Sequence, residues 1–185
     1  MKNTAINTLQ YTGIVTLSQY IGTKKIKIAQ VHNTGGSVLF DFLSDCLVGD
    51  IEKAQTKKPT KLRLVNYVQV SDNLEDGYTF KSASAGFIYL LSSPKKTSSS
   101  SESSVTYSFL IPREFLENVQ SFSGLGLGLY TNSTTDDESM IPDFVAFCKL
   151  PEIHASRNVL TKSSLVVDWK LVISNANTTV QPVKE

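Results

Sequence analysis

The sequence contains few of the residues that most often form a chemical site. Its 185 residues include two cysteines, two histidines and one tryptophan, and the formal net charge is +1. A net charge this close to zero argues against the extended basic surface with which proteins bind nucleic acid or an anionic membrane. We therefore expect protein partners, and we expect neither sequence-specific nucleic acid nor a membrane among them.

Long apolar runs are also missing. No apolar segment approaches the roughly 20 residues that a membrane-spanning helix requires. The amino-terminal residues Met1 to Thr4 do not lead into the apolar core of a secretory signal. We expect the chain to be made and folded in a reducing cytoplasm.

The cysteines and histidines do not match a metal site or a catalytic pair. Cys46 lies in an apolar helical pattern and Cys148 in an apolar strand pattern, so both are expected to be small buried side chains. The sequence leaves open a disulfide between them. The spacing of these cysteines with His32 and His154 fits no zinc finger or zinc knuckle. We predict no metal site.

Three short motifs also lack the features of a functional site. The acidic run Asp136-Asp137-Glu138 lacks the alternating oxygen ligands of a calcium loop. Gly35-Gly36-Ser37 precedes a helical pattern but has no lysine in the Walker position, so a tight turn with a capping serine accounts for it. Leucines separate Gly124, Gly126 and Gly128, and no helix follows them. Since no G-x-S-x-G sequence is present either, we predict no catalytic residue, no cofactor-binding residue and no cofactor.

The clearest structural pattern lies near the carboxyl end, over residues 164–173. Successive side chains of an extended strand point to opposite faces, and here one face is entirely apolar. Trp169 lies in the middle of that face, where a large aromatic side chain would anchor a core. The residues of this face are Leu165, Val167, Trp169, Leu171 and Ile173.

The same alternation recurs along the chain and predicts a mainly β protein. A change to three- and four-residue spacing predicts a helix over 38–47, and Pro112 suits the start of a short helix that ends at Val119. Strands do not alternate regularly with helices, which favours an antiparallel β-sandwich or jelly-roll-like barrel with one or two inserted helices. The further strands are predicted at 11–20, 24–31, 61–70, 78–80, 87–91, 105–111, 125–130 and 144–150, the first two as a hairpin.

The length of the chain suits one domain. We place a single β-rich domain at 11–174, between a flexible amino-terminal arm at 1–10 and a polar carboxyl-terminal tail at 175–185. Within the domain, the serine-rich segment 92–104 contains almost nothing to bury and is predicted to be a mobile loop.

Three segments resemble small β-rich structural proteins of tailed-bacteriophage particles. They are Ser108-Phe109-Leu110-Ile111-Pro112, the strand from Phe144 to Pro151, and Leu165 to Asn175 with Asp168-Trp169-Lys170 at its centre. The resemblance implies a non-enzymatic virion subunit that contacts copies of itself and other virion proteins through arms, loops and sheet edges. Such proteins form rings at the head–tail junction or tail, or decorate the capsid.

Two other functions remain open. A carbohydrate- or ligand-binding β-sandwich module would display exposed aromatic side chains clustered on one face. An enzyme of unrecognised type would hold His32 or His154 in a pocket with a carboxylate. The tyrosines available for the aromatic cluster are Tyr11, Tyr20, Tyr67, Tyr78, Tyr89 and Tyr130.

Overall fold

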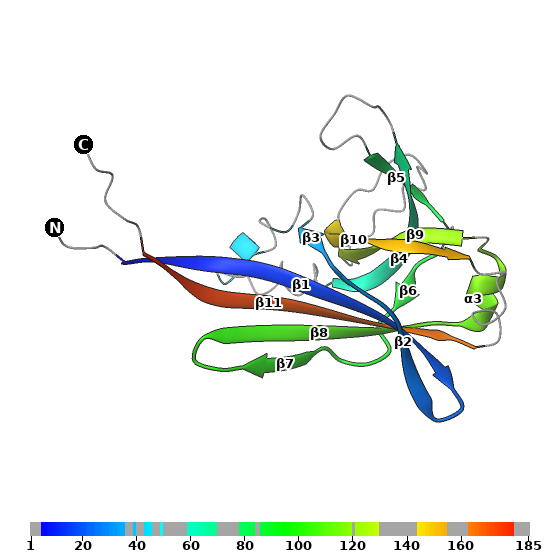
Figure 1. Cartoon of the computed structure of the whole chain (residues 1–185), viewed down its shortest axis with the longest axis horizontal. Coiled ribbons are helices and arrows are strands. Elements are labelled where there is room, and N and C mark those ends of the chain that lie inside the picture. Colours follow the sequence, from blue (N-terminus) through cyan, green and yellow to red (C-terminus); the bar gives the residue numbers. More distant parts are fainter. Residues whose placement is uncertain are drawn as a thin grey trace.

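Two antiparallel β-sheets pack face to face and form a β-sandwich (Figure 1). This confirms the predicted mainly β, antiparallel class. The computed structural model describes residues 5–35, 39, 43–45, 49, 59–69, 78–83, 86–119, 121–129, 144–154 and 163–179.

The first sheet has five strands in the order β2-β1-β11-β8-β7. The last described strand, β11, lies at its centre, between β1 and β8, and all its pairings are antiparallel. The strands are β1 (Ala5–Ile21), β2 (Lys24–His32), β7 (Lys95–Ser98), β8 (Glu102–Ile111) and β11 (Leu165–Thr179).

The second sheet has six strands in the order β3-β10-β9-β4-β5, and β6 also pairs with β4. A short helix, α3 (Arg113–Glu117), follows Pro112 and confirms the second predicted helix. The strands of this sheet are β3 (Thr34–Gly35), β4 (Pro59–Gln69), β5 (Tyr78–Ser82), β6 (Ile88–Tyr89), β9 (Ser121–Leu129) and β10 (Phe144–His154).

The chain passes from one sheet to the other at both edges of the sandwich. Only Asn33 separates β2 from β3, which lie in different sheets. The Asn33 side chain donates a hydrogen bond to the Tyr11 hydroxyl at 2.8 Å, which holds this crossing against β1. A Cβ at Gly13 would lie 1.3 Å from Asn33 Oδ1, so a larger residue there would displace the Asn33 side chain. At the other edge, β6 pairs with β4 while Leu90 bridges to β8.

The core lies between the sheets, and Trp169 is the largest of its fully buried side chains. Trp169 is paired with Val15 of β1 and with Tyr107 of β8, so three neighbouring strands contribute to one row of the core. The strand predicted around Trp169 is confirmed. The next largest fully buried side chains are Phe109, Phe122, Leu17, Leu62, Leu64, Ile111, Leu116, Leu125, Leu127, Leu165 and Val15.

The first predicted helix falls mostly outside the described residues. Of the segment 38–47, the structure describes Leu39 and residues 43–45, which are helical. Leu39 is buried against Val145 of β10, with Tyr11 and Leu43 packed around them. The strand predicted to end at Pro151 instead continues to His154, with a shift in its pairing to β9 after Lys149.

The prediction of a mobile loop at 92–104 was wrong. Residues 95–98 form β7 and pair with the first part of β8, so the segment is mostly a β-hairpin. Its turn is closed by the Ser99 amide, which donates to the Glu102 carbonyl at 2.7 Å. Across the hairpin, the Ser103 hydroxyl donates to Ser98 Oγ at 3.2 Å. A serine-rich hairpin is ordered here by backbone and hydroxyl hydrogen bonds, without burying apolar surface.

The predicted arm and tail also differ from the structure. Residues 5–10 belong to β1 and pair with residues 174–179 of β11. The flanking residues 1–4 and 180–185 lie outside the described part of the chain. Strand alternation does not predict these segments, because they extend past the core, where no apolar face is needed.

Replacing Trp169 should separate the contribution of its ring from that of its indole N–H. Trp169 Nε1 is buried and has no hydrogen-bond partner among the described residues. Trp169→Ala should lower the free energy of unfolding by about 3–5 kcal/mol because it leaves a large cavity. Trp169→Phe keeps a ring in the core, loses no hydrogen bond, and should cost clearly less in urea denaturation. Equal losses for the two variants would contradict this account.

Candidate interaction surface

The first and last strands continue past the sandwich as a two-stranded ribbon. Pairing of β11 with β8 ends at Ser174 and that of β1 with β2 at Ile14. Beyond those points residues 5–9 pair only with residues 175–179, among the residues that the structure describes. This segment, here called the terminal ribbon, is about 17 Å long at 3.3–3.4 Å per residue. Figure 1 shows it leaving the sandwich on the side where both chain ends lie.

The terminal ribbon contains no charged residue. Its two strands have the sequences Ala-Ile-Asn-Thr-Leu and Asn-Ala-Asn-Thr-Thr. Isolated two-stranded β-structure is marginally stable in water, and each outer edge presents backbone donors and acceptors to a further strand. The ribbon is therefore suited to pairing with another chain.

The opposite end of β1 forms an exposed hairpin with β2. Gly22 has a φ of 61°, which suits glycine in the tight turn of this hairpin. We call residues 20–28 the hairpin tip. Four of the six large apolar side chains exposed among the described residues lie in it. They are Tyr20, Ile21, Ile26 and Ile28, whereas Tyr89 and Leu91 lie elsewhere.

The exposure of the isoleucines differs from what strand alternation implies. The alternation of Ile26 and Ile28 with lysines indicates one apolar face, as in a half-buried strand. In the structure Ile26 is 45% exposed and Ile28 is 36% exposed. A register shift between Leu17 and Ser18 falls at this point in the pairing of β1 with β2. A β-bulge of this kind bends an edge strand and redirects its side chains.

The hairpin tip is basic. It contains Lys24, Lys25 and Lys27, and no acidic residue occurs anywhere between residues 5 and 35. Lys25 Nζ lies 2.5 Å from Asp168 Oδ2 on β11, and Lys27 Nζ donates to Gln30 Oε1 at 3.1 Å. Ion pairs between exposed side chains contribute only about 0–1 kcal/mol.

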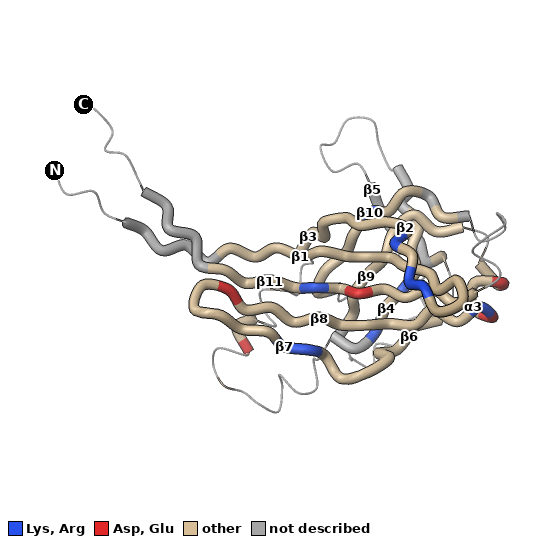
Figure 2. The backbone as a smooth tube through the Cα atoms, turned by 60° about the horizontal axis from the view of Figure 1, so that its bottom comes forward, with Lys and Arg blue, Asp and Glu red and all other residues tan. Residues whose placement is uncertain are grey.

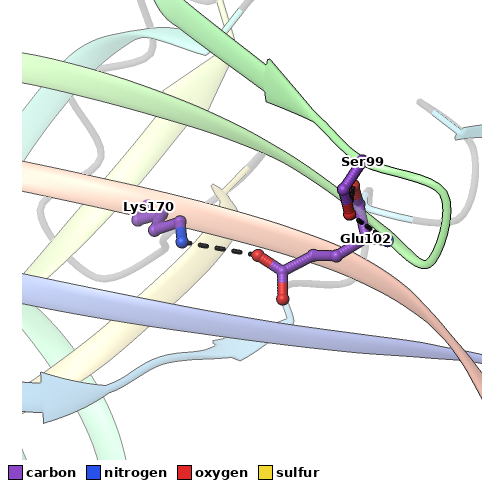
Figure 3. Close-up of polar contacts among 3 residues, drawn as sticks. All are labelled: Ser99, Glu102 and Lys170. Carbon is purple, nitrogen blue, oxygen red and sulfur yellow. Dashed lines mark hydrogen bonds and ion pairs between the residues drawn. The ribbon is translucent and has the colours of Figure 1, made fainter.

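Ion pairs and hydrogen bonds cross the outer face of the first sheet around Asp168 and Lys170. Asp168, besides contacting Lys25, accepts a hydrogen bond from the Ser108 hydroxyl at 2.8 Å. Lys170 Nζ lies 3.5 Å from Glu102 Oε1, beside the Ser99 turn (Figure 3). Figure 2 shows charged residues along β2, β11, β8 and β7. These contacts join strands of this face.

Both edge strands of this sheet contain lysines. β2 has the three lysines of the hairpin tip, and β7 contains Lys95 and Lys96 within a fully exposed strand. Lysines on edge strands oppose pairing between like edges, because they would place positive charges side by side. The neutral terminal ribbon has no such protection.

The candidate chemical residues are not brought together among the described residues. His32 is exposed at the end of β2, and only the backbone of His154 is described, in β10. Cys148 is buried, whereas Cys46 and residues 136–138 lie outside the described part of the chain. Within the described ranges, no three histidine, cysteine or acidic side chains form a group able to hold a metal ion.

The glycine motifs occupy structural positions. Gly35 ends β3, and the two residues that follow it are not described. Gly124, Gly126 and Gly128 are buried within β9 and pair with residues of β4 and β10.

The described tyrosines do not form one exposed aromatic cluster. Tyr20 belongs to the first sheet and Tyr89 to the second, while Tyr11 is only partly exposed and bonded to Asn33. The side chains of Tyr67 and Tyr78, and the whole of Tyr130, lie outside the described residues.

No protein-family model, curated protein or solved structure matches this chain. No helix in the described part of the chain is both long enough and apolar enough to cross a membrane.

The terminal ribbon was missed by sequence reasoning, and the hairpin tip was only partly anticipated. The turn at Gly22-Thr23 and the lysines of β2 are visible in the sequence. The pairing of residues 5–9 with 175–179 joins segments from opposite ends of the chain. A local sequence pattern cannot predict such a pairing.

Cys148 should be unreactive in the folded protein. Burial raises the pKa of its thiol to about 12, against a smaller lowering by a backbone hydrogen bond at Leu125. Only the thiolate is nucleophilic. At pH 8, wild type and Cys148→Ala should therefore show equal numbers of thiols that react with a disulfide reagent. In denaturant, wild type should show one more.

The same burial predicts a loss of stability at high pH. The thiol ionises near pH 9.0 when exposed and only near pH 12 when folded, so the unfolded chain releases its proton first as pH rises. The contribution of the buried, protonated thiol to the free energy of unfolding is complete below pH 9 and is lost towards pH 12. The free energy of unfolding of Cys148→Ala should lack this pH-dependent contribution. An extra reactive thiol in folded wild type would contradict the assignment.

Proposed function

We propose that this protein is a non-enzymatic structural subunit that assembles with copies of itself and with other particle proteins. Its second half resembles small tailed-phage proteins. On that basis we propose that it belongs to a virion, where its copies form a ring at the head–tail junction or tail. A capsid-decorating subunit is the alternative position. The observation that supports assembly is the terminal ribbon, a strand pair outside the sandwich whose two outer edges pair with no other described strand.

The terminal ribbon supports assembly for an energetic reason. Ordering backbone costs conformational entropy, which strands normally recover through pairing and through burial of one face. Beyond Ser174 the ribbon has two strands and no third one, among the described residues. A third strand from another subunit would form hydrogen bonds with the backbone N–H and C=O groups at one outer edge of the ribbon.

The rest of the molecule suits a rigid scaffold for such a contact. The two sheets share one core, and the chain joins them at both edges. Chemical groups that catalysis would use are sparse in the sequence, and the described cysteine is buried. The exposed tyrosines Tyr20 and Tyr89 lie on different sheets, which gives a carbohydrate-binding module less support.

Removing one strand of the terminal ribbon should abolish self-association. We expect light scattering behind a sizing column to show a closed oligomer for the full chain, across a range of concentrations. A variant lacking residues 1–9 should be a monomer. Its thermal midpoint should be nearly unchanged, because Val15 is the first buried core side chain among those that the structure describes.

A variant lacking residues 180–185 is the control, since it shortens the chain but keeps every pair of the ribbon. It should retain the mass of the full-length oligomer. A full chain that is monomeric at every concentration would contradict the proposed self-assembly.

A further inference from the structure

We infer that the terminal ribbon of one copy pairs with the open edge of β2 in a second copy, so that subunits join head to tail. This inference rests on the proposed function and identifies the two surfaces that meet. The ribbon lies at one end of β1 and the hairpin tip at the other (Figure 1). A contact between two different surfaces is heterologous, and it generates a ring when the rotation between copies closes.

The edge of β2 is open for strand addition. β2 pairs with β1 on one side, and no described strand pairs with its other side before the chain crosses into β3. The Asn33 amide donates to the Gly13 carbonyl at 3.1 Å, which makes Gly13 and Asn33 a hydrogen-bonded pair. Such pairs alternate with non-hydrogen-bonded ones along an antiparallel ladder. Gln30, opposite Thr16, therefore turns its backbone N–H and C=O away from β1.

Charge determines which strand this edge accepts. A second β2 or β7 would bring its own lysines against Lys24, Lys25 and Lys27. The strands of the terminal ribbon contain no charged residue and meet no such repulsion. Among the open edges on described strands of the first sheet, the ribbon is thus the electrostatically compatible partner for β2.

The apolar side chains of the hairpin tip support the same pairing. Tyr20, Ile21, Ile26 and Ile28 are exposed in the single chain. A strand added along β2 would cover part of this surface. Concentrated exposed apolar surface is typical of a contact site.

The arrangement of lysines argues against a membrane as the partner of the hairpin tip. Lys24 and Lys25 directly follow the Gly22-Thr23 turn, so they lie at the extremity of the hairpin. A hairpin that entered a bilayer by its turn would place these charges deepest, where they are costly. A second copy is the occupant that the charges and the open strands favour.

Gln30→Pro tests the contact by removing one outward-facing N–H from β2. Gln30 is exposed, and its one described side-chain bond is with Lys27, so folding should survive. Gln30→Ala is the matched control because it keeps the N–H. Light scattering should show monomers for Gln30→Pro and wild-type oligomers for Gln30→Ala, with both retaining the cooperative thermal transition of wild type.

Mixing two non-assembling variants then identifies the surfaces. The variant lacking residues 1–9 keeps β2, and Gln30→Pro keeps the terminal ribbon. An equimolar mixture should give one species with twice the monomer mass and nothing larger. If Gln30→Pro does not fold, Ile26→Lys with Ile28→Lys replaces it, since both positions are exposed.

The outcomes separate this inference from the proposed function. Oligomers of wild-type mass from folded Gln30→Pro, or a mixture that stays monomeric while wild type assembles, would overturn the β2 contact and leave self-assembly standing. A monomeric wild type would overturn both. Sedimentation of the variant lacking residues 1–9 with phosphatidylserine vesicles, without a heterodimer, would instead assign the hairpin tip to a membrane.

Discussion

The antiparallel pairing of β1 with β11 is the interaction on which the rest of the structure depends. It joins the two ends of the chain over fifteen residue pairs, from Ala5 with Thr179 to Gln19 with Leu165. These strands form the middle of the first sheet, and β2 and β8 add to their outer sides. Trp169 lies on β11, and its side chain is part of the core between the sheets. Because the pairing is so distant in sequence, the sandwich is complete only after the last strand joins the first.

The length of these two strands accounts for the candidate surface. Both are longer than the sandwich needs, so one end of the pair emerges as the neutral terminal ribbon. At the other end β1 turns into β2 and forms the basic, apolar hairpin tip. The lysines that keep the sheet edges from pairing with each other leave the ribbon as the unprotected strand pair. A single structural element thus supplies two different surfaces at opposite ends of the subunit.

Much of the fold follows from strand alternation, because alternation reports burial of one face on a core. The strand around Trp169 is predictable on this basis. The short helix after Pro112 is predictable on another, the preference of proline for a helix start. The terminal ribbon and the hairpin at 92–104 are not, since their order depends on backbone and hydroxyl hydrogen bonds. For the isoleucines of β2, strand alternation instead predicts a burial that the structure does not show. They alternate as a buried face would, but Ile28 is the unpaired residue of a bulge opposite Leu17 and Ser18, and both isoleucines are exposed.

Hydrogen exchange of the backbone amides tests the central claim most directly. If the first and last strands pair beyond the sandwich and this pair is the assembly contact, amides in residues 5–9 and 175–179 should exchange slowly in the oligomer. Dilution to monomers should speed their exchange while the core amides around Trp169 stay protected. Rapid exchange of both segments in the oligomer, at the rate of an unfolded chain, would contradict the account.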